Sequence, residues 1–364
     1  MVDLKVYNSN IKDSNNIIYD IQLVHKMNLV IGESSSGKSY LMSLIESFNS
    51  GNSGDIVVSC NKKVEAVRSL SVLKDVISQN KDILIILDED TVGAIRRNNK
   101  IVSMKDLVKS PNYFLLMDRQ SAVKMDCNVK AVYEFSRTGA VGGINAYKAV
   151  HHFKLSDVSI DEIDTSKYRY LITEDDKSGK IFFDKLLGKL EVVDLVAEGN
   201  GAIANTITPE MAREGVLVAL DYDCGALALQ SIIYKCRKYD GKISLISMEC
   251  FEEIVCNSDF ILDAFPEMRD KVLNYEKYLS ADDKHTGKYF ARLLKEYVKQ
   301  RPPVETHSDR NVEKFYSKGA GHIENCLTED CCKYNKEDEC KLYVNGDKQD
   351  KMLSNKFDWL NAFR

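Results

Sequence analysis

The sequence predicts an α/β protein with a doubly wound domain in its first half, a second α/β domain and a small cysteine-containing C-terminal tail. Two observations support this prediction. Short apolar runs alternate along the chain with segments of helical periodicity, and several runs end in acidic residues or a glycine-rich loop. Continuous apolar runs are typical of strands buried on both faces of a parallel sheet, and their alternation with helices favours a doubly wound fold.

The expected elements follow from these runs in chain order. In the first half we expect strands at residues 29–31, 55–60, 83–87, 113–117 and 131–135, and helices at 39–48 and 63–78. In the second half we expect strands at residues 168–174, 190–196, 215–223 and 243–246, helices at 178–187 and 227–239, and a turn at 199–201. A helix is also expected near residues 284–301, before a less ordered tail.

Composition limits the classes of protein to which the chain can belong. The 364 residues suit two domains, and the content of 44% hydrophobic and 29% charged residues is ordinary for a globular protein. No apolar stretch is long enough to cross a bilayer and the N-terminus lacks the apolar region of a signal peptide, so we expect no membrane association and a cytoplasmic location. The net charge of −5 argues against general coating of nucleic acid, but a local basic surface is compatible with it.

The most informative motif is the G-x-x-x-x-G-K-S stretch after the first apolar run. Its glycines allow the backbone to wrap around a phosphate, and backbone N–H groups at the start of the next helix supply positive potential. Lys38 is placed to reach the outer phosphates of ATP, and the Ser39 hydroxyl to hold Mg²⁺. The alternative is a flexible serine-rich turn. The predicted nucleotide-binding residues of the loop are Gly32, Glu33, Ser34, Ser35, Ser36, Gly37, Lys38 and Ser39.

Two later apolar runs also end in charged residues. Asp88 and Glu89 follow the run at 83–87, where we expect Asp88 to bind Mg²⁺ through water and Glu89 to act on the attacking water. Asp118 and Arg119 follow the run at 113–117, a position from which the γ-phosphate can be sensed. For both pairs the alternative is a strand end that is simply solvated.

With these motifs, the first half resembles a minimal core of AAA-like and ABC-like ATPases. It contains no LSGGQ-like signature, so the resemblance implies either another group that completes the site in trans or slow hydrolysis. A site completed in trans also favours a homo-oligomer. The candidates for the trans-acting group are Arg96, Arg97, Arg119 and Arg137.

Acidic residues end two of the strands predicted in the second half. Glu174 closes the run at 168–174, and Asp221-Tyr222-Asp223 closes the run at 215–223. Because the carboxyl ends of parallel strands meet at one edge of a sheet, we expect Glu174, Asp221 and Asp223 to lie together. The alternative for each acid is a solvated strand end.

The glutamate followed by D-x-D resembles the TOPRIM fold of topoisomerases, primases and OLD-family nucleases. An ATPase domain followed by a TOPRIM domain resembles the OLD family of ATP-dependent nucleases, which includes proteins of phage defence. The resemblance covers about residues 20–265 and implies that Glu174, Asp221 and Asp223 are catalytic ligands of Mg²⁺ or Mn²⁺. The sequence departs from the family pattern at Asp175, where glycine is usual, and at Ser178, where an acid is usual. Either Asp176 substitutes as a ligand or one metal site is lost.

Two features of the last hundred residues suggest further binding. Residues 284–301 are basic with interleaved aromatic side chains, which is typical either of a phosphate-backbone contact or of an amphipathic helix with its apolar side chains packed inward. Those apolar side chains are Phe290, Leu293, Leu294 and Val298. Further on, a histidine and four cysteines could hold Zn²⁺, with redox or disulfide chemistry and unliganded thiols as alternatives. These five residues are His322, Cys326, Cys331, Cys332 and Cys340.

Together these motifs predict an ATP-binding, metal-dependent nuclease that cleaves DNA or RNA phosphodiesters under nucleotide control. The competing hypothesis is a non-catalytic nucleotide switch with a degenerate TOPRIM domain. We expect a P-loop ATPase domain at residues 1–155, a TOPRIM-like domain at 156–270 and a helical, basic, cysteine-containing extension at 271–364.

Overall fold

The structure is a computed structural model in which the chain divides into two compact units. The first unit comprises Met1–Phe153 and Glu276–His285, and the second comprises Lys154–Tyr275 and Thr286–Arg364. The expected extension at residues 271–364 is therefore shared between the two units and is not a third one. The structure describes residues 1–11, 16–97, 100–119, 127–159, 163–174, 183, 187, 190–193, 200–222, 225–239, 242–257, 262, 265–283, 285–300 and 356–361.

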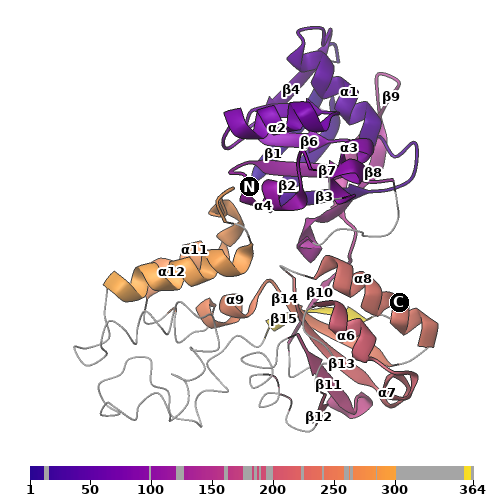
Figure 1. Cartoon of the computed structure of the whole chain (residues 1–364), viewed down its shortest axis with the longest axis vertical. Coiled ribbons are helices and arrows are strands. Elements are labelled where there is room, and N and C mark those ends of the chain that lie inside the picture. The colour runs from indigo at the N-terminus through magenta and orange to yellow at the C-terminus, as the bar shows by residue number, and fades with distance from the viewer. Residues whose placement is uncertain are drawn as a thin grey trace. The chain divides into compact units, whose positions relative to one another are not determined.

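The first unit is built on a nine-stranded mixed sheet (Figure 1). The strand order is β4-β1-β2-β9-β8-β3-β7-β6-β5. The strands are β1 (Val2–Asn8), β2 (Ile17–Leu23), β3 (Met27–Ile31), β4 (Ile56–Cys60), β5 (Val64–Val67), β6 (Leu84–Leu87), β7 (Tyr113–Met117), β8 (Val132–Val141) and β9 (Ile144–His151). The helices are α1 (Lys38–Asn49), α2 (Leu70–Gln79), α3 (Glu89–Arg96) and α4 (Met104–Lys109), with a 3-10 turn η1 (Val129–Ala131).

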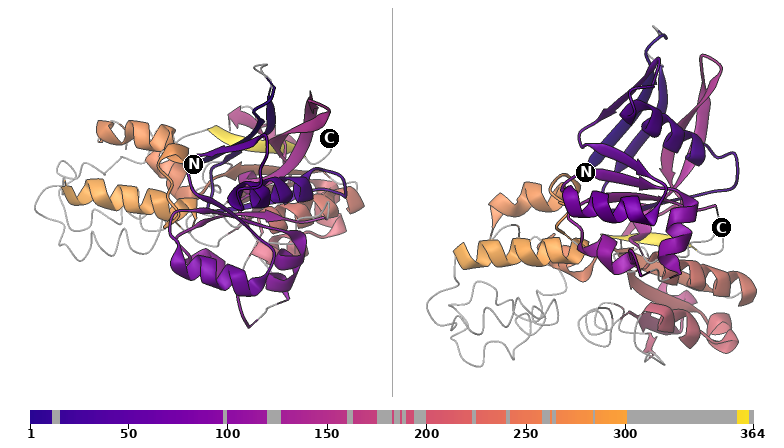
Figure 2. Two further views of the ribbon diagram at one scale, coloured as in Figure 1. Left: turned by 90° about the horizontal axis from the view of Figure 1, so that it is seen from above. Right: turned by 45° about the horizontal axis from the view of Figure 1, so that its top comes forward.

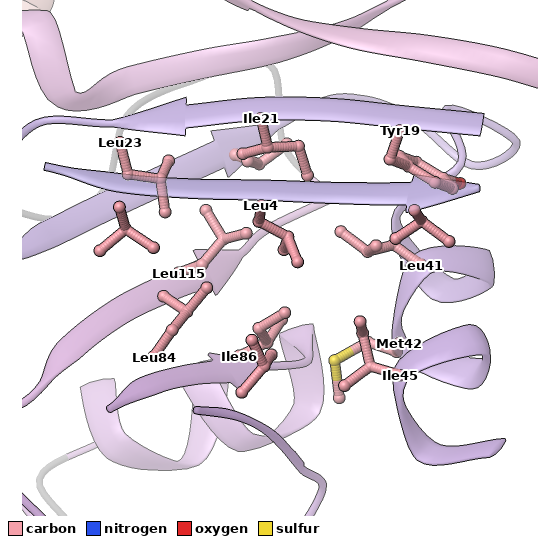
Figure 3. Packing of buried hydrophobic residues seen from close by; sticks show 14 of the residues in the cluster. Leu4, Tyr19, Ile21, Leu23, Leu41, Met42, Ile45, Leu84, Ile86 and Leu115 are labelled. Atoms are coloured by element: carbon pink, nitrogen blue, oxygen red, sulfur yellow. The ribbon is translucent and has the colours of Figure 1, made fainter. Parts of the chain in front are cut away.

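Five neighbouring strands of this sheet, β8-β3-β7-β6-β5, run parallel. The apolar runs of β6 and β7 are buried at every position, which confirms the interpretation of such runs as strands covered on both faces. Leu41, Met42 and Ile45 of α1 pack into one core cluster with Leu4 and Tyr19 of the sheet (Figure 3). Further views of these layers are given in Figure 2.

The remaining strands correct the prediction of a simple doubly wound sheet. β1 pairs antiparallel with both β2 and β4, and β8 pairs antiparallel with β9. Residues 56–60 therefore form an antiparallel edge strand and not a member of the parallel set. The helix expected at 63–78 is shorter, because Val64–Val67 form β5 and α2 begins only at Leu70, where Ser69 caps it.

The second unit is built on a six-stranded sheet in the order β10-β15-β14-β13-β11-β12. β12, β11, β13 and β14 are parallel, whereas β15 is antiparallel to β14 and β10. The strands are β10 (Ser156–Ser159), β11 (Tyr170–Thr173), β12 (Glu191–Val192), β13 (Val216–Asp221), β14 (Ile243–Met248) and β15 (Lys356–Asn361). The helices are α6 (Asn200–Thr206), α7 (Pro209–Glu214), α8 (Ala226–Tyr239), α9 (Phe251–Cys256), α11 (Arg269–Leu273) and α12 (Thr286–Gln300), with 3-10 turns η3 (Thr165–Lys167), η4 (Pro266–Met268) and η5 (Tyr275–Lys277).

Several expectations for the second half are confirmed and others are wrong. The strands at β11, β13 and β14 and the helices α8 and α12 are present, with Phe290 and Leu293 of α12 buried as predicted. The turn expected at 199–201 is wrong for Asn200 and Gly201, which begin α6. Most of the helix expected at 178–187 lies outside the described residues. The tail contains a strand, β15, which the sequence did not predict.

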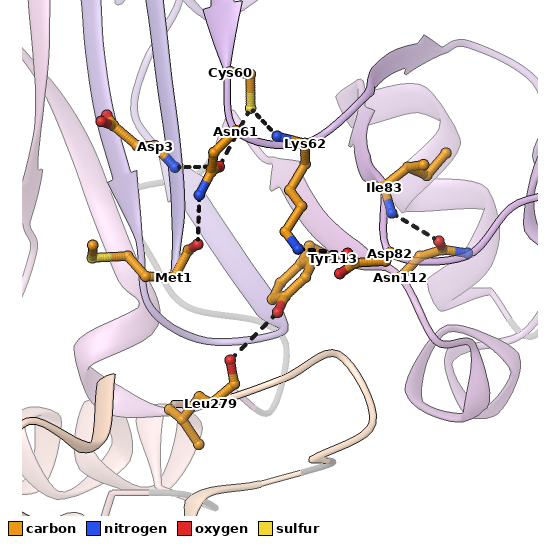
Figure 4. Close-up of polar contacts among 10 residues, drawn as sticks. All are labelled: Met1, Asp3, Cys60, Asn61, Lys62, Asp82, Ile83, Asn112, Tyr113 and Leu279. Atoms are coloured by element: carbon orange, nitrogen blue, oxygen red, sulfur yellow. Dashed lines mark hydrogen bonds and ion pairs between the residues drawn. The ribbon is translucent and has the colours of Figure 1, made fainter. Parts of the chain in front are cut away.

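The segment Glu276–His285 packs against strands of the first unit that lie far from it in the sequence. Leu279 and Ala281 are buried, and Ala281 belongs to the core cluster of this unit. The Tyr113 hydroxyl donates a hydrogen bond to the Leu279 carbonyl at 3.5 Å, and the Lys62 ammonium lies 5.7 Å from the centre of the Tyr113 ring (Figure 4). Tyr113 begins β7, so this contact lies at the amino edge of the parallel strands.

Within the described part of the chain, no helix has both the length and the apolar character needed to cross a membrane.

Candidate functional site

The glycine-rich loop connects β3 to α1. Val30 and Ile31 at the end of β3 are buried, and α1 begins at Lys38 with Gly37 as its N-cap. Gly32 and Gly37 have φ angles of 147° and 91°, values that favour glycine over residues with a side chain. The loop therefore has the strand–loop–helix placement that its motif requires.

Lys38 lies across this loop, with only 6% of its surface exposed. Its Nζ donates to the carbonyl oxygens of Gly32 at 2.5 Å and Glu33 at 3.1 Å, and to Oγ of Ser36 at 2.7 Å. Burial lowers the Lys38 pKa, while the charge of Glu89 raises it. The three loop acceptors are two neutral carbonyls and a hydroxyl, so an anion beside the loop would stabilise the buried ammonium.

A tyrosine pair from β2 and β9 holds the second glycine of the loop. The Tyr19 hydroxyl donates to the Gly37 carbonyl at 2.7 Å, and that carbonyl also accepts the Leu41 N–H at 3.0 Å. The Tyr19 ring stacks on Tyr147 with 5.2 Å between ring centres, and a Cβ on Gly37 would lie 2.9 Å from both tyrosines. Because the Gly37 carbonyl points into the helix, the N–H of Lys38 on the opposite side of that trans peptide points out of its N-terminus.

A pocket of about 400 Å³ opens beside the loop. Loop residues 33–39 line it together with Tyr40, Glu89, Arg119, Asn145 and Tyr147. β7 and β6 are successive neighbours of β3 in the parallel sheet, so the residues after all three strands meet at the carboxyl edge. The structure thus brings the predicted loop, Glu89 and Arg119 together at one site.

The two acids after β6 have different surroundings. Asp88 is the N-cap of α3, where its Oδ1 accepts the Thr91 N–H at 2.9 Å, and its Oδ2 lies 3.8 Å from the Arg68 guanidinium. Glu89 lines the pocket and forms an ion pair with Arg119. Hydroxyl and carboxylate oxygens are ligands that Mg²⁺ prefers. Of the two residues expected to hold Mg²⁺, Ser39 lines the pocket and Asp88 directly precedes the lining residue Glu89.

The four arginines considered for a trans-acting role have partners or positions of their own. Arg96 pairs with Asp118 at 2.8 Å, and Arg119 pairs with Glu89. Arg97 is the C-cap of α3, and Arg137 lies on the exposed part of β8. Arg119 is the one of these four that lines the pocket.

The second predicted site lies at the carboxyl edge of the other sheet. β11 and β13 are parallel neighbours, with Thr173 opposite Ala219, so Glu174, directly after β11, lies near Asp221, the last residue of β13. The Asp221 N–H donates to Oε2 of Glu174 at 3.0 Å. On the other side of β13, β14 is followed by Glu249, which is fully buried and accepts a hydrogen bond from the Thr286 hydroxyl at 3.3 Å.

Other predicted metal ligands cannot be placed. Asp176 and Asp223, and the possible zinc ligands His322, Cys326, Cys331, Cys332 and Cys340, lie outside the described residues. Among the residues that the structure does describe, no group of three or more His, Cys, Asp or Glu side chains is arranged to hold a metal ion. The arrangement of Glu174 beside Asp221 is the part of the predicted acidic site that the structure displays.

Sequence reasoning missed four residues of the first site, namely Tyr19, Tyr40, Asn145 and Tyr147. The alternating pattern of residues 17–23 is a strand signal, but it does not indicate which strand lies beside the loop.

In comparisons with known proteins, the sequence matches no family model and no curated protein.

Proposed function

We propose that the first unit binds ATP with Mg²⁺ at residues 32–39. The observation that carries this proposal is the buried Lys38 ammonium, which crosses a glycine loop at the rim of a pocket that also contains Glu89 and Arg119. Phosphates would contact the N–H groups at the start of α1 and the Lys38 ammonium, and Arg119 is close enough to the same pocket to contact the outermost phosphate. Ser39 and Asp88 would hold Mg²⁺, which neutralises phosphate charge, and Glu89 would orient the attacking water.

We further propose that the second unit is a metal-dependent nuclease under the control of the first. The adjacent positions of Glu174 and Asp221 support a site for Mg²⁺ or Mn²⁺, completed by Asp223 and Asp176. Bound metal would supply an activated water and stabilise charge on the scissile phosphate of DNA or RNA. The carboxylates of this chain would hold the ions at the sheet edge.

A non-catalytic nucleotide switch is the second candidate, and a specific observation favours it. One carboxylate oxygen of Glu174 accepts the backbone N–H of Asp221, so part of its capacity as a ligand is used within the protein. Asp175 and Ser178 replace residues that the TOPRIM resemblance leads one to expect. In this case the second unit would be a platform for binding or assembly.

Nucleotide binding is tested by titrating ATP and Mg²⁺ into the wild type and Lys38→Ala. We expect binding to the wild type and a loss of at least tenfold in affinity for the variant. Lys63→Ala is the matched control, because Lys63 is an exposed lysine of the same unit that pairs with Glu65. Equal affinities for Lys38→Ala and the wild type would contradict the proposal.

Cleavage is tested with supercoiled and single-stranded nucleic acids, in Mn²⁺ or Mg²⁺, with and without ATP. We expect wild-type cleavage and its loss in Asp221→Ala. Glu210→Ala is the control, since Glu210 is an exposed acid on α7 of the same unit. If the wild type does not cleave, or if Asp221→Ala cleaves equally well, the switch becomes the better account.

A further inference from the structure

We propose that the pocket contains a subsite that selects adenine, formed by Tyr40, Asn145 and Tyr147. This inference rests on the proposed nucleotide site and goes beyond it, because it names the base and the residues that recognise it. A phosphate-binding loop alone does not distinguish one nucleoside triphosphate from another, or from inorganic tripolyphosphate. The selection must come from other side chains of the same pocket.

The sheet places Asn145 and Tyr147 of β9 on the opposite side of the loop from Glu89 and Arg119. In the strand order, β9 and β8 lie on one side of β3, and β7 and β6 lie on the other. Neighbouring strands are about 4.8 Å apart, so β9 and β7 are separated by roughly 14 Å. An extended nucleotide could therefore place its outer phosphate near Arg119 and its base near β9.

The β8–β9 hairpin extends beyond the end of β3 and forms a wall beside the loop. Ile31, the last residue of β3, pairs with Glu134 of β8, whereas Tyr147 of β9 pairs with Arg137 further along β8. At about 3.3 Å per residue, Tyr147 stands roughly 10 Å past the end of β3. This height is that of the loop and the first turn of α1, which agrees with the close approach of Tyr147 to Gly37.

Two tyrosines give this side of the pocket its aromatic character. One face of Tyr147 stacks on Tyr19, which fixes the ring over Gly37. Tyr40 stands in the first turn of α1, lines the pocket and is 39% exposed, so part of its ring is open to a ligand. Aromatic rings bind nucleobases by stacking, a contact that every base can make. Tyr40 therefore explains binding of a base but not the choice of adenine.

Asn145 is the residue that we propose selects adenine over guanine. Its side-chain amide has two N–H donors and one carbonyl acceptor, and one of the donors is directed to the Tyr147 hydroxyl at 3.3 Å. One N–H and the carbonyl remain, which match the N7 acceptor and the N6 amino donor of adenine. Guanine has two acceptors, O6 and N7, at the same edge, so the Asn145 carbonyl would face another acceptor.

The test compares the affinities of ATP, GTP and inorganic tripolyphosphate, each with Mg²⁺, by titration calorimetry. For the wild type we expect ATP to bind at least tenfold more tightly than GTP or tripolyphosphate. Asn145→Leu should bring the affinities for ATP and GTP to within about twofold of each other. Tyr40→Ala should lose about tenfold in ATP affinity, whereas Tyr40→Phe should keep it, because only the ring is needed.

Tripolyphosphate separates this proposal from the proposed function on which it depends. Unchanged tripolyphosphate binding by the Asn145 and Tyr40 variants would show that they are folded and that their effect is confined to the base. If the wild type binds all three ligands equally and Lys38→Ala abolishes this binding, the adenine subsite is overturned and the phosphate site is not. Failure of all three ligands to bind would overturn both.

Discussion

The Tyr19 hydroxyl ties β2 to the glycine-rich loop through its hydrogen bond to the Gly37 carbonyl. Tyr19→Phe removes its hydrogen bond to the Gly37 carbonyl but keeps the stack on Tyr147. We expect the free energy of unfolding to fall by about 1 kcal/mol and ATP affinity to fall severalfold, because the Gly37–Lys38 peptide loses one of its two anchors. Gly37→Ala should lower both the free energy of unfolding and the ATP affinity further. Its added Cβ would contact both tyrosines, and the residue would have to keep a positive φ. Denaturant titration and calorimetry measure the two effects, and unchanged ATP affinity in Tyr19→Phe would contradict this role.

The lowered pKa of Lys38 predicts how anion binding depends on pH. Burial favours the neutral amine, so the ammonium loses its proton at a lower pH than an ordinary lysine, whose pKa is about 10.4. Affinity for tripolyphosphate should therefore begin to fall below that pH, and binding in this window should take up protons because the anion stabilises the charged form. Calorimetry in buffers of different ionisation enthalpy measures the uptake. Lys38→Arg is the control. Its guanidinium stays charged, so the affinity of this variant for tripolyphosphate should not change with pH in this window.

At the scale of elements, Asp88 combines two roles that one substitution can separate. It caps α3 through its contact with the Thr91 N–H, and its other carboxylate oxygen, which lies 3.8 Å from the Arg68 guanidinium, is the one that we propose binds Mg²⁺. Asparagine is an equally good N-cap, so Asp88→Asn should change the free energy of unfolding by less than about 0.5 kcal/mol. In this variant Mg²⁺ should no longer increase the affinity for ATP. Removal of Mg²⁺ with a chelator should have the same effect on the ATP affinity of the wild type. Asp82→Asn, at an exposed acid paired with Lys62, should keep that tightening.

The elements that could be predicted from the sequence are those with a strong local signal. β6, β7 and β13 are buried along nearly their whole length, and continuous apolar runs reveal such strands. β5 was mistaken for the start of a helix because Val64 and Val67, its buried residues, also have helical spacing. The glycine loop and the acids after β6, β11 and β13 could be identified because their chemistry lies in consecutive residues.

The rest of the first site depends on pairings that no local pattern encodes. Tyr147 reaches Gly37 because β9 lies beside β2, where Tyr19 pairs directly with Tyr147. Asn145 and Tyr147 belong to a hairpin whose length beyond β3 sets its height beside the loop. Strand order and register are tertiary properties, so composition and periodicity could not supply these residues.

At the scale of the whole molecule, the segment Glu276–His285 makes the stability of the first unit depend on residues far along the chain. Ala281 is buried in the core cluster of that unit, so Ala281→Asp would place a charge there without a partner. We expect a loss of about 3 kcal/mol in the free energy of unfolding of the first unit. Hydrogen-exchange mass spectrometry measures it locally: amides of β1, β6 and β7 should exchange faster, while those of β13 and β14 should keep their wild-type rates. Lys277→Asp places the same side chain at an exposed position of the segment and should leave the exchange rates of every strand unchanged. Equal protection of β7 in Ala281→Asp and the wild type would show that the segment does not support the first unit.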